Sequence, residues 1–280
     1  MRIDDSARRP RICVVIADHR HDQYLTDLVR SLRVFAPTVD VAVYNAGDAE
    51  RLIAHPVYED IRVLPMSRRL LYAKVTPFFL DLFEWAGLEE YDYVVNAETD
   101  MAWIKPGFED FIAEAMRGYD YMGPGFLRGT ARTSKWRPYR SLRPELPELH
   151  ALLGVAGTNR CFSPAQVFSA KYINALLSSP FYDDLKRFVI RNQAPDKSFT
   201  LQEVLLPTLV DALSLTGRDY PGHLATVNRY RPYHAARSVV HAVGVPDAYF
   251  VHPIRRDEQD PARIAARQII AGASAVGVGQ

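Results

Sequence analysis

The stretch YDYVVNAETDM, which runs from Tyr91 to Met101, passes from an apolar segment into two acids one residue apart. Its apolar part, residues 93–95, has the pattern of a strand buried on both faces, and Glu98 and Asp100 follow directly. Two carboxylates this close repel each other, and burying them without a partner is unfavourable. The pair therefore indicates either a bound cation or a solvated strand end, and its place after a buried strand favours the cation.

Three further strand-like segments precede this one, and helical patterns lie between them. The strand-like segments are short apolar runs, whereas the helical patterns repeat their apolar residues every three or four positions. This alternation predicts an α/β fold, with a single domain over residues 1–280 and a mostly parallel central sheet flanked by helices. The expected strands are 11–18, 39–47 and 60–67, and the expected helices are 21–37, 48–54 and 70–87.

The pattern after residue 118 is less regular. Residues 128–150 are rich in Arg and Pro and lack periodicity, which predicts a long loop. Residues 1–10 and 271–280 are expected to be flexible. The other elements expected here are a strand at 119–126, a strand and a helix within 165–177, a helix at 199–215 that bends at Pro207, and a strand at 248–256.

Composition limits the class of protein. The 280 residues carry a net charge of +1, which argues against a general nucleic-acid binder. Cys13 and Cys161 are the only cysteines, so the sequence contains no disulfide framework. The N-terminal residues form no hydrophobic signal segment, and no apolar stretch reaches the roughly 18 residues that a membrane helix needs. We therefore expect a soluble cytoplasmic protein without a membrane span, and its oligomeric state stays open.

Two common nucleotide-binding motifs are missing from the sequence. The first strand is followed by ADHRHDQY instead of Gly-x-Gly-x-x-Gly, and no Gly-Lys-Ser/Thr P-loop occurs. Ligands of parallel sheets nevertheless bind at the carboxyl ends of the strands. Asp18, Arg20 and Asn45 follow the first two strands, so they are candidate ligand contacts. The alternative is that polar residues simply end these strands.

The order of elements and the acid pair resemble a GT-A glycosyltransferase, an enzyme that uses a nucleotide diphosphate sugar as its donor. GT-A enzymes place an Asp-x-Asp motif after the fourth strand, and here Glu98 stands in place of the first Asp, with Asn96-x-Glu98 as an alternative frame. The resemblance implies a Mn²⁺ or Mg²⁺ ion that bridges the acids and the donor diphosphate. It also implies that residues 11–117 bind the nucleotide sugar and that residues 118–260 bind the acceptor.

The same resemblance implies further donor-side residues. Lys74, in the stretch YAKVTPF, matches a basic residue that faces the donor nucleotide in many GT-A enzymes, although an exposed helix lysine is an equal alternative. The stretch YFVHPIRR resembles the last GT-A strand, so His252 is implied as the third metal ligand beside the two acids. Arg255 and Arg256 are then expected to contact phosphate oxygens.

Two stretches are candidates for binding the acceptor. AQVFSAKYI resembles the GT-A strand and helix that form the acceptor floor, with Gln166 and Ser169 as the polar positions. Residues 128–143 hold five Arg and one Lys with Trp136 and Tyr139, and no acid. We expect a mobile loop over donor or acceptor there, with a solvated loop or a single-stranded nucleic-acid contact as alternatives.

Glu203 is the candidate catalytic base. It lies among apolar residues at the start of an expected helix, and inverting transfer needs one carboxylate to deprotonate the acceptor hydroxyl. Apolar surroundings raise the pKa of such a carboxylate toward a useful value. Asp196 is the rival candidate, and an acid in the first turn that stabilises the helix is the structural alternative for Glu203.

Together these features predict a glycosyltransferase that moves a sugar from a nucleotide diphosphate sugar to a hydroxyl or amine of a small-molecule or glycan acceptor. Inversion and assistance by a divalent metal are favoured. One alternative is a sugar nucleotidyltransferase, although its glycine- and lysine-rich loop after the first strand is absent. The other alternative is a non-catalytic nucleotide- or carbohydrate-binding protein with the same fold.

Overall fold

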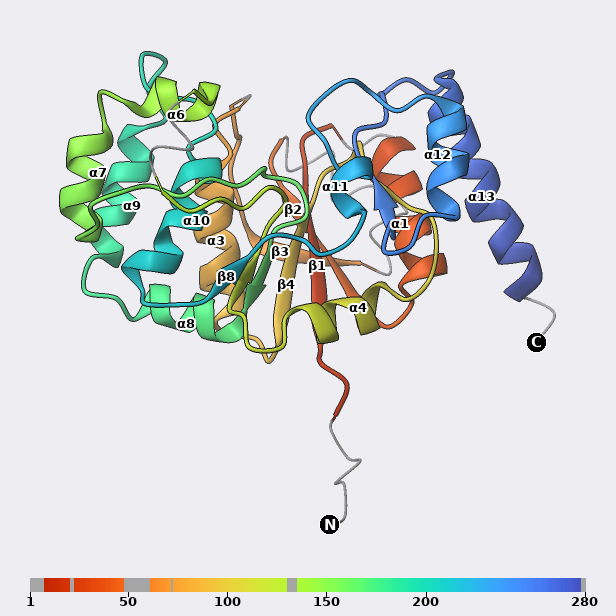
Figure 1. Cartoon of the computed structure of the whole chain (residues 1–280), viewed down its shortest axis with the longest axis horizontal. Helices are drawn as coiled ribbons and strands as arrows, with labels where there is room; N and C mark the ends of the chain where they lie inside the picture. The colour runs from red at the N-terminus through yellow and green to blue at the C-terminus, as the bar shows by residue number, and fades with distance from the viewer. Residues whose placement is uncertain (1–7, 21–22, 48–60, 72, 130–134, 278–280) are drawn as a thin grey trace, which may run out of the picture.

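A mixed sheet of seven strands forms the centre of the protein in the computed structural model (Figure 1), which describes residues 8–20, 23–47, 61–71, 73–129 and 135–277. Its strands are β1 (Ile12–Asp18), β2 (Asp40–Asn45), β3 (Arg62–Ser67), β4 (Tyr93–Ala97), β6 (Tyr121–Met122), β7 (Val167–Ser169) and β8 (Gly217–Arg218). They follow the order β3-β2-β1-β4-β7-β6-β8. The first four run parallel, and β7 is antiparallel to both of its neighbours. The predicted α/β fold with a mostly parallel sheet is therefore confirmed.

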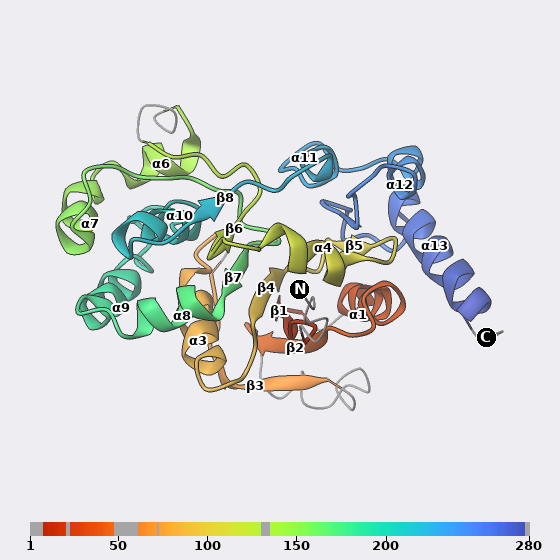
Figure 2. The ribbon, with the colours of Figure 1, turned by 60° about the horizontal axis from the view of Figure 1, so that its bottom comes forward.

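Helices cover both faces of this sheet (Figures 1 and 2). One face packs against α1 (Gln23–Phe35), α4 (Phe108–Ala115), α11 (Leu224–Val227), α12 (Ala236–Val243) and α13 (Pro261–Gly277). The other face packs against α3 (Thr76–Ala86), α6 (Arg137–Leu142), α7 (Leu146–Leu153), α8 (Ala170–Leu177), α9 (Tyr182–Arg191) and α10 (Gln202–Ala212). Among the described residues, no helix combines the length and the apolar character that crossing a membrane requires.

A continuous apolar run forms a central strand because its side chains pack into the cores on both faces of the sheet, as β1 shows. Along β1, Val14 and Ile16 pack into the core beneath α1 and α13, whereas Cys13 and Val15 pack into the core beneath α3 and α8. Successive side chains of a strand point to opposite faces, so both sets are buried at once. All four side chains are fully buried, and β1 is therefore a central strand of the sheet.

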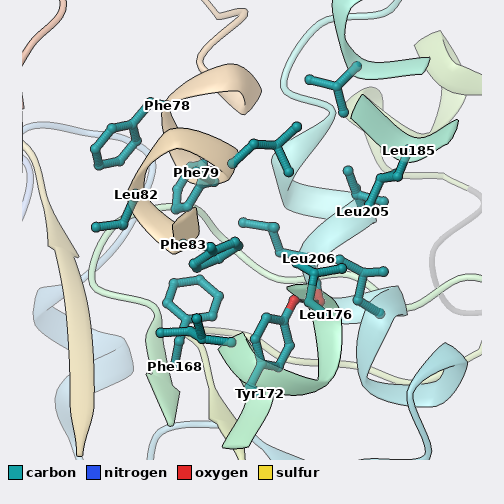
Figure 3. Close-up of a cluster of buried hydrophobic side chains, with 14 of the residues drawn as sticks. Phe78, Phe79, Leu82, Phe83, Phe168, Tyr172, Leu176, Leu185, Leu205 and Leu206 are labelled. Atoms are coloured by element: carbon teal, nitrogen blue, oxygen red, sulfur yellow. Dashed lines mark hydrogen bonds between the residues drawn. The ribbon is translucent and has the colours of Figure 1, made fainter. Parts of the chain in front are cut away.

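Aromatic packing fixes α10 against the sheet (Figure 3). The ring of Phe83 in α3 lies 4.8 Å from that of Phe168 in β7 and 5.8 Å from that of Tyr172 in α8, measured between centroids. Edge-on ring pairs of this kind stabilise a core beyond the area that they bury. Tyr172 also donates a hydrogen bond to the carbonyl oxygen of Leu206 in α10 at 2.8 Å. The start of α10, and with it Glu203, is thereby held in a fixed position.

The second half of the chain contains more helix than the sequence predicted. The segment expected to be a loop, 128–150, includes α6 and the start of α7, in which Leu146, Leu149 and Leu153 are buried. Their spacing is helical, but the many Arg and Pro residues around them obscured it. The sequence analysis also missed α9, α12 and most of α13.

Two further expectations concern the tail 271–280 and the segment 48–54. Residues 271–277, which belong to the tail expected to be flexible, lie within α13. Alanine has the highest intrinsic helix propensity, which favours a helix in this alanine-containing segment. The helix expected at 48–54 lies outside the described residues.

Lys74, just before α3, connects two distant parts of the chain. Its Nζ atom donates to the carbonyl oxygens of Asn192 at 2.7 Å, Ala194 at 2.6 Å, Lys197 at 3.2 Å and Ser198 at 3.3 Å. Burial lowers the pKa of Lys74. The ammonium group therefore holds the connection between α9 and α10, which differs from the expected contact with a donor nucleotide.

We expect Lys74→Met to lower the free energy of unfolding by about 1.5–3 kcal/mol, because it leaves several carbonyl groups without their charged donor. Chemical denaturation of the purified variant measures this. Lys197→Met is the matched control, since the Lys197 side chain makes only a 3.9 Å ion pair with its neighbour, and its effect should stay within about 0.5 kcal/mol. Unchanged stability together with weaker nucleotide-sugar binding would instead place Lys74 in the donor site.

Candidate active site

A short antiparallel sheet brings the far end of the chain to the acid pair. Its strands are β5 (Ala102–Trp103) and β9 (Phe250–Val251), which pair Ala102 with Val251 and Trp103 with Phe250. The next backbone contact runs from the amide of Ile254 to the carbonyl oxygen of Asp100 at 2.8 Å. His252 lies between these two contacts and so comes beside Asp100.

Glu98, Asp100 and His252 form one cluster, in which Asp100 and His252 are buried and Glu98 is half-buried. One ligand atom from each of them lies within 4.8 Å of the others, and His252 Nε2 is 3.4 Å from Asp100 Oδ1. Burial acts to raise the pKa of Asp100, but His252 and the charge of Arg256 overcome it and lower this pKa to about 2. Burial and the charge of Asp100 raise the pKa of Glu98, and the charges of His252, Arg256 and Arg231 partly oppose the rise. The three predicted metal ligands are thus brought together.

The donor set of this cluster suits a divalent cation. Asp100 Oδ1 and His252 Nδ1 are buried and have no hydrogen-bond partner. A buried polar atom without a hydrogen bond is unfavourable by about 1–3 kcal/mol, so a ligand bound to these atoms would be stabilising. Carboxylate oxygens and an imidazole nitrogen are ligands that Mn²⁺ accepts, and Mg²⁺ accepts the carboxylates. The residues present therefore fit the ion that the sequence implied.

Glu203 lies beside this cluster in the first turn of α10. Its Oε1 accepts a hydrogen bond from the backbone amide of Ser163 at 3.3 Å, and its carbonyl oxygen accepts one from the amide of Cys161 at 2.9 Å. Burial raises the pKa of Glu203 to about 8, the Ser163 amide opposes the rise, and the charge of Glu98 adds to it. Glu203 is only 7% exposed and is mostly protonated at neutral pH.

The segment between Cys161 and Ala165 connects Glu203 to the metal cluster. The ring centroids of Phe162 and His252 are 5.5 Å apart, and the carbonyl oxygen of Pro164 accepts a hydrogen bond from Asn228 Nδ2 at 3.3 Å. Ser163 Oγ and Asn228 Oδ1 are both buried without a hydrogen-bond partner. These polar atoms line the same region as the acids. No local sequence pattern marks them, because only the folded chain brings residues 163 and 228 together.

The ends of β1 and β2 form the opposite side of the site. Asp18 and Asn45 are paired in register and both are buried. The segments that follow β1 and β2 lie in close contact. A Cβ atom on Gly47 would lie only 2.3 Å from the carbonyl oxygen of His19. Burial and then the charges of Arg256 and, less strongly, Arg20 lower the pKa of His19, so these arginines face this edge.

A buried arginine that the sequence analysis missed holds the parts together. Arg263 in α13 donates to the carbonyl oxygen of Arg255 at 2.9 Å and to that of Thr99, between the two acids, at 3.4 Å. Its guanidinium also pairs with Asp27 of α1 at 3.1 Å, and both side chains are almost fully buried. Arg263 therefore fixes the turn that carries Glu98 and Asp100, and the segment that carries Arg255, relative to helices α1 and α13.

The structure gives several predicted residues other positions or roles. Ser169 pairs with Tyr93 at the start of β4, far along the strand from Glu98, and its hydroxyl caps α8. Gln166 has no exposed surface, and Tyr139 is buried in the core. The side chain of Asp196 is 76% exposed and pairs with Lys197. Trp136 is half-buried at the start of α6. Lys74 binds the α9–α10 connection.

Comparison with known proteins shows a likeness in structure only. No protein-family model matches the chain, and no curated protein does. The structure of the galactosyltransferase LgtC in complex with donor and acceptor sugar analogs superposes with a TM-score of 0.51 at 10% identity, covering 93% of this chain and 95% of that one. An active-site mutant of LgtC gives a TM-score of 0.52 at 11% identity, with the same coverage.

A weaker match is core-mannan synthase A from Aspergillus fumigatus in its Mn/GDP form, with a TM-score of 0.42 at 8% identity over 77% of this chain and 74% of that one. The LgtC match spans nearly all of both chains. The chain described here therefore has the GT-A glycosyltransferase fold.

Proposed function

We propose that this protein is a metal-assisted glycosyltransferase that uses a nucleotide diphosphate sugar. The observation that carries the proposal is the cluster of Glu98, Asp100 and His252, with Glu203 beside it. The cluster follows β4, at the edge of the parallel sheet where ligands of such sheets bind. A metal site and a separate carboxylate of raised pKa in one place are what glycosyl transfer needs.

The donor lies between the ends of β1 and β2 and the segment after β9. A Mn²⁺ or Mg²⁺ ion held by Glu98, Asp100 and His252 supplies positive charge to the diphosphate, which is the leaving group. Arg256, whose side chain lies 3.5 Å from Asp100, adds a second positive charge there, and Arg255 follows on the same segment. Arginine suits phosphate because its planar group donates two parallel hydrogen bonds.

Glu203 takes the role of general base. Its ionised carboxylate removes the proton of the acceptor hydroxyl or amine as that group attacks the anomeric carbon. The bond from this carbon to the diphosphate breaks at the same time, on the opposite face, so the configuration inverts. Glu203 belongs to residues 118–260, the acceptor half, and its contact with Ser163 fixes the orientation of the carboxylate.

Asp100→Asn tests the metal site. The change keeps the size of the side chain but removes the charge that faces the cation, so nucleoside diphosphate binding in saturating Mn²⁺ should weaken to the level seen in EDTA. Isothermal titration calorimetry measures this. Asp257→Asn, in an exposed acid five residues after His252, is the matched control and should bind as the unaltered protein does. Equal Mn²⁺-dependent binding by Asp100→Asn would move the metal site elsewhere.

Glu203→Gln tests the base. General-base catalysis typically contributes about 10² to 10⁴ in rate, so the turnover number should fall by that order while donor affinity stays close to normal. With a pKa of about 8 for Glu203, the active ionised form increases from pH 7 to pH 9, so turnover of the unaltered enzyme should rise over this range. The variant should lose that rise. A product of retained configuration by NMR would remove the base role.

The same variant should be more stable than the unaltered protein at neutral and alkaline pH. Folding raises the pKa of Glu203 from its ordinary value of 4.5 to about 8, so folding stability falls as the pH increases from 4.5 to 8. Gln cannot ionise and still accepts the Ser163 hydrogen bond. The stability gain of Glu203→Gln should grow over this interval to a few kcal/mol and then level off. Thermal unfolding at several pH values measures it, and a gain independent of pH would contradict the raised pKa.

A further inference from the structure

A continuous row of arginine and aromatic side chains runs past the active site. Its members come from four separate parts of the chain, and each touches the next or follows it within two residues. We call this row the arginine–aromatic belt. It consists of Trp136, Arg160, Phe162, Tyr230, Arg231, Tyr233 and Arg255.

At one end of the belt, the guanidinium of Arg160 lies 5.5 Å from the ring centroid of Trp136. Phe162 follows two residues later, and its ring lies 6.3 Å from that of Tyr230 and 5.5 Å from that of the metal ligand His252. The belt therefore passes directly beside the metal cluster. Tyr230 is 65% exposed, so its ring is accessible to a ligand.

At the other end, Arg231 is held between two tyrosines. Its guanidinium lies 4.0 Å from the ring centroid of Tyr233 and 5.0 Å from that of Tyr230. It also donates to the Tyr230 carbonyl oxygen at 2.8 Å and to the Tyr233 hydroxyl at 2.9 Å. Arg255 stands over Tyr233 at 5.1 Å. Stacking fixes the orientation of each planar guanidinium before any ligand arrives.

The positive charges of the belt are poorly neutralised. In the part of the chain that the structure describes, neither Arg160 nor Arg231 forms an ion pair, and Arg255 approaches Asp260 only to 3.8 Å. Residues 220–246 contain no Asp or Glu at all. The whole chain carries a net charge of only +1, so this excess is local to the belt. Although the charge of Arg231 also acts on Glu98, Arg231 forms no ion pair with that acid, and a local excess of arginine over acids attracts an anionic ligand.

We infer that the belt binds the acceptor through its members other than Arg255, which faces the donor diphosphate, and that this acceptor is an acidic oligosaccharide whose sugar units carry carboxylate or phosphate groups. The inference rests on the proposed glycosyltransferase function and specifies its acceptor. Aromatic rings pack against the apolar C–H faces of sugar rings, and the arginines between them pair with the anionic groups. The donor diphosphate does not account for the belt, because Arg160 stands on Trp136 at the end opposite Arg255.

Binding to four probes of similar length tests the inference. The probes are tetragalacturonate, a phosphorylated maltotetraose, unmodified maltotetraose and a short single-stranded oligonucleotide. The unaltered protein should bind at least one of the acidic sugars about tenfold or more tightly than maltotetraose, and added salt should weaken that binding. The carboxylate and phosphate probes distinguish the two sources of negative charge.

Arg231→Gln and Arg160→Gln should each lower the affinity for the preferred acidic sugar by about tenfold, and leave the weak binding of maltotetraose unchanged. Arg237→Gln is the matched control, since Arg237 is exposed in the same acid-free segment but outside the belt, and its effect should be negligible. Equal binding of acidic and neutral sugars would overturn the inference. Tighter binding of the oligonucleotide than of either acidic sugar would also overturn it, because aromatic and basic residues also bind single strands.

A parallel assay separates this inference from the proposed function. The unaltered protein is incubated with nucleotide sugars and Mn²⁺, and the release of nucleoside diphosphate is measured with each sugar probe as acceptor. Faster release with the acidic probe than with maltotetraose supports the inference. Release that does not distinguish the two contradicts the inference alone, whereas no release under any condition contradicts the glycosyltransferase itself.

Discussion

The site depends on three carboxylates held close together with little contact with water, those of the half-buried Glu98 and the buried Asp100 and Glu203. Charges of one sign in a buried site are unfavourable unless positive groups offset them or one group stays protonated. Both solutions occur here, since His252 and Arg256 act on Asp100 while Glu203 keeps its proton at neutral pH. The pKa of Asp100 is therefore about 2, which suits a metal ligand, whereas the pKa of Glu203 is about 8, which suits a group that transfers protons.

Keeping these groups together requires contacts between distant parts of the chain. The β5–β9 pair brings His252 to Asp100, and Arg263 ties the acid turn to Arg255 and to α1. The aromatic packing of α3, β7 and α8 holds α10, which carries Glu203, on the other side. The active site thus lies between the two cores of the sheet. The core beneath α1 and α13 supports the acids of the metal cluster, and the core beneath α3 and α8 supports Glu203.

The sequence predicted the parts that depend on local pattern. Apolar runs located the parallel strands, and the acids after β4 located the metal cluster. His252 came from a resemblance to a known fold, because no local rule places residues so far apart side by side. Ser163, Asn228 and Arg263 gave no signal, since their roles arise only from long-range contacts. Lys74 and Ser169 were predicted to contact ligands, but Lys74 binds backbone carbonyl groups of the α9–α10 connection and Ser169 caps α8. A polar side chain in a suitable sequence position can serve either purpose.

The release of nucleoside diphosphate from UDP-, GDP- and dTDP-sugars tests the central claim most directly. The purified protein is incubated with each donor in Mn²⁺ or in EDTA, with acidic and neutral sugar acceptors, and the products are separated by chromatography. The account predicts that at least one donor yields its nucleoside diphosphate, that this release requires the metal, and that a new glycoside accumulates. Release of pyrophosphate on incubation with a nucleoside triphosphate and a sugar phosphate, or binding of donors without any turnover, would contradict it.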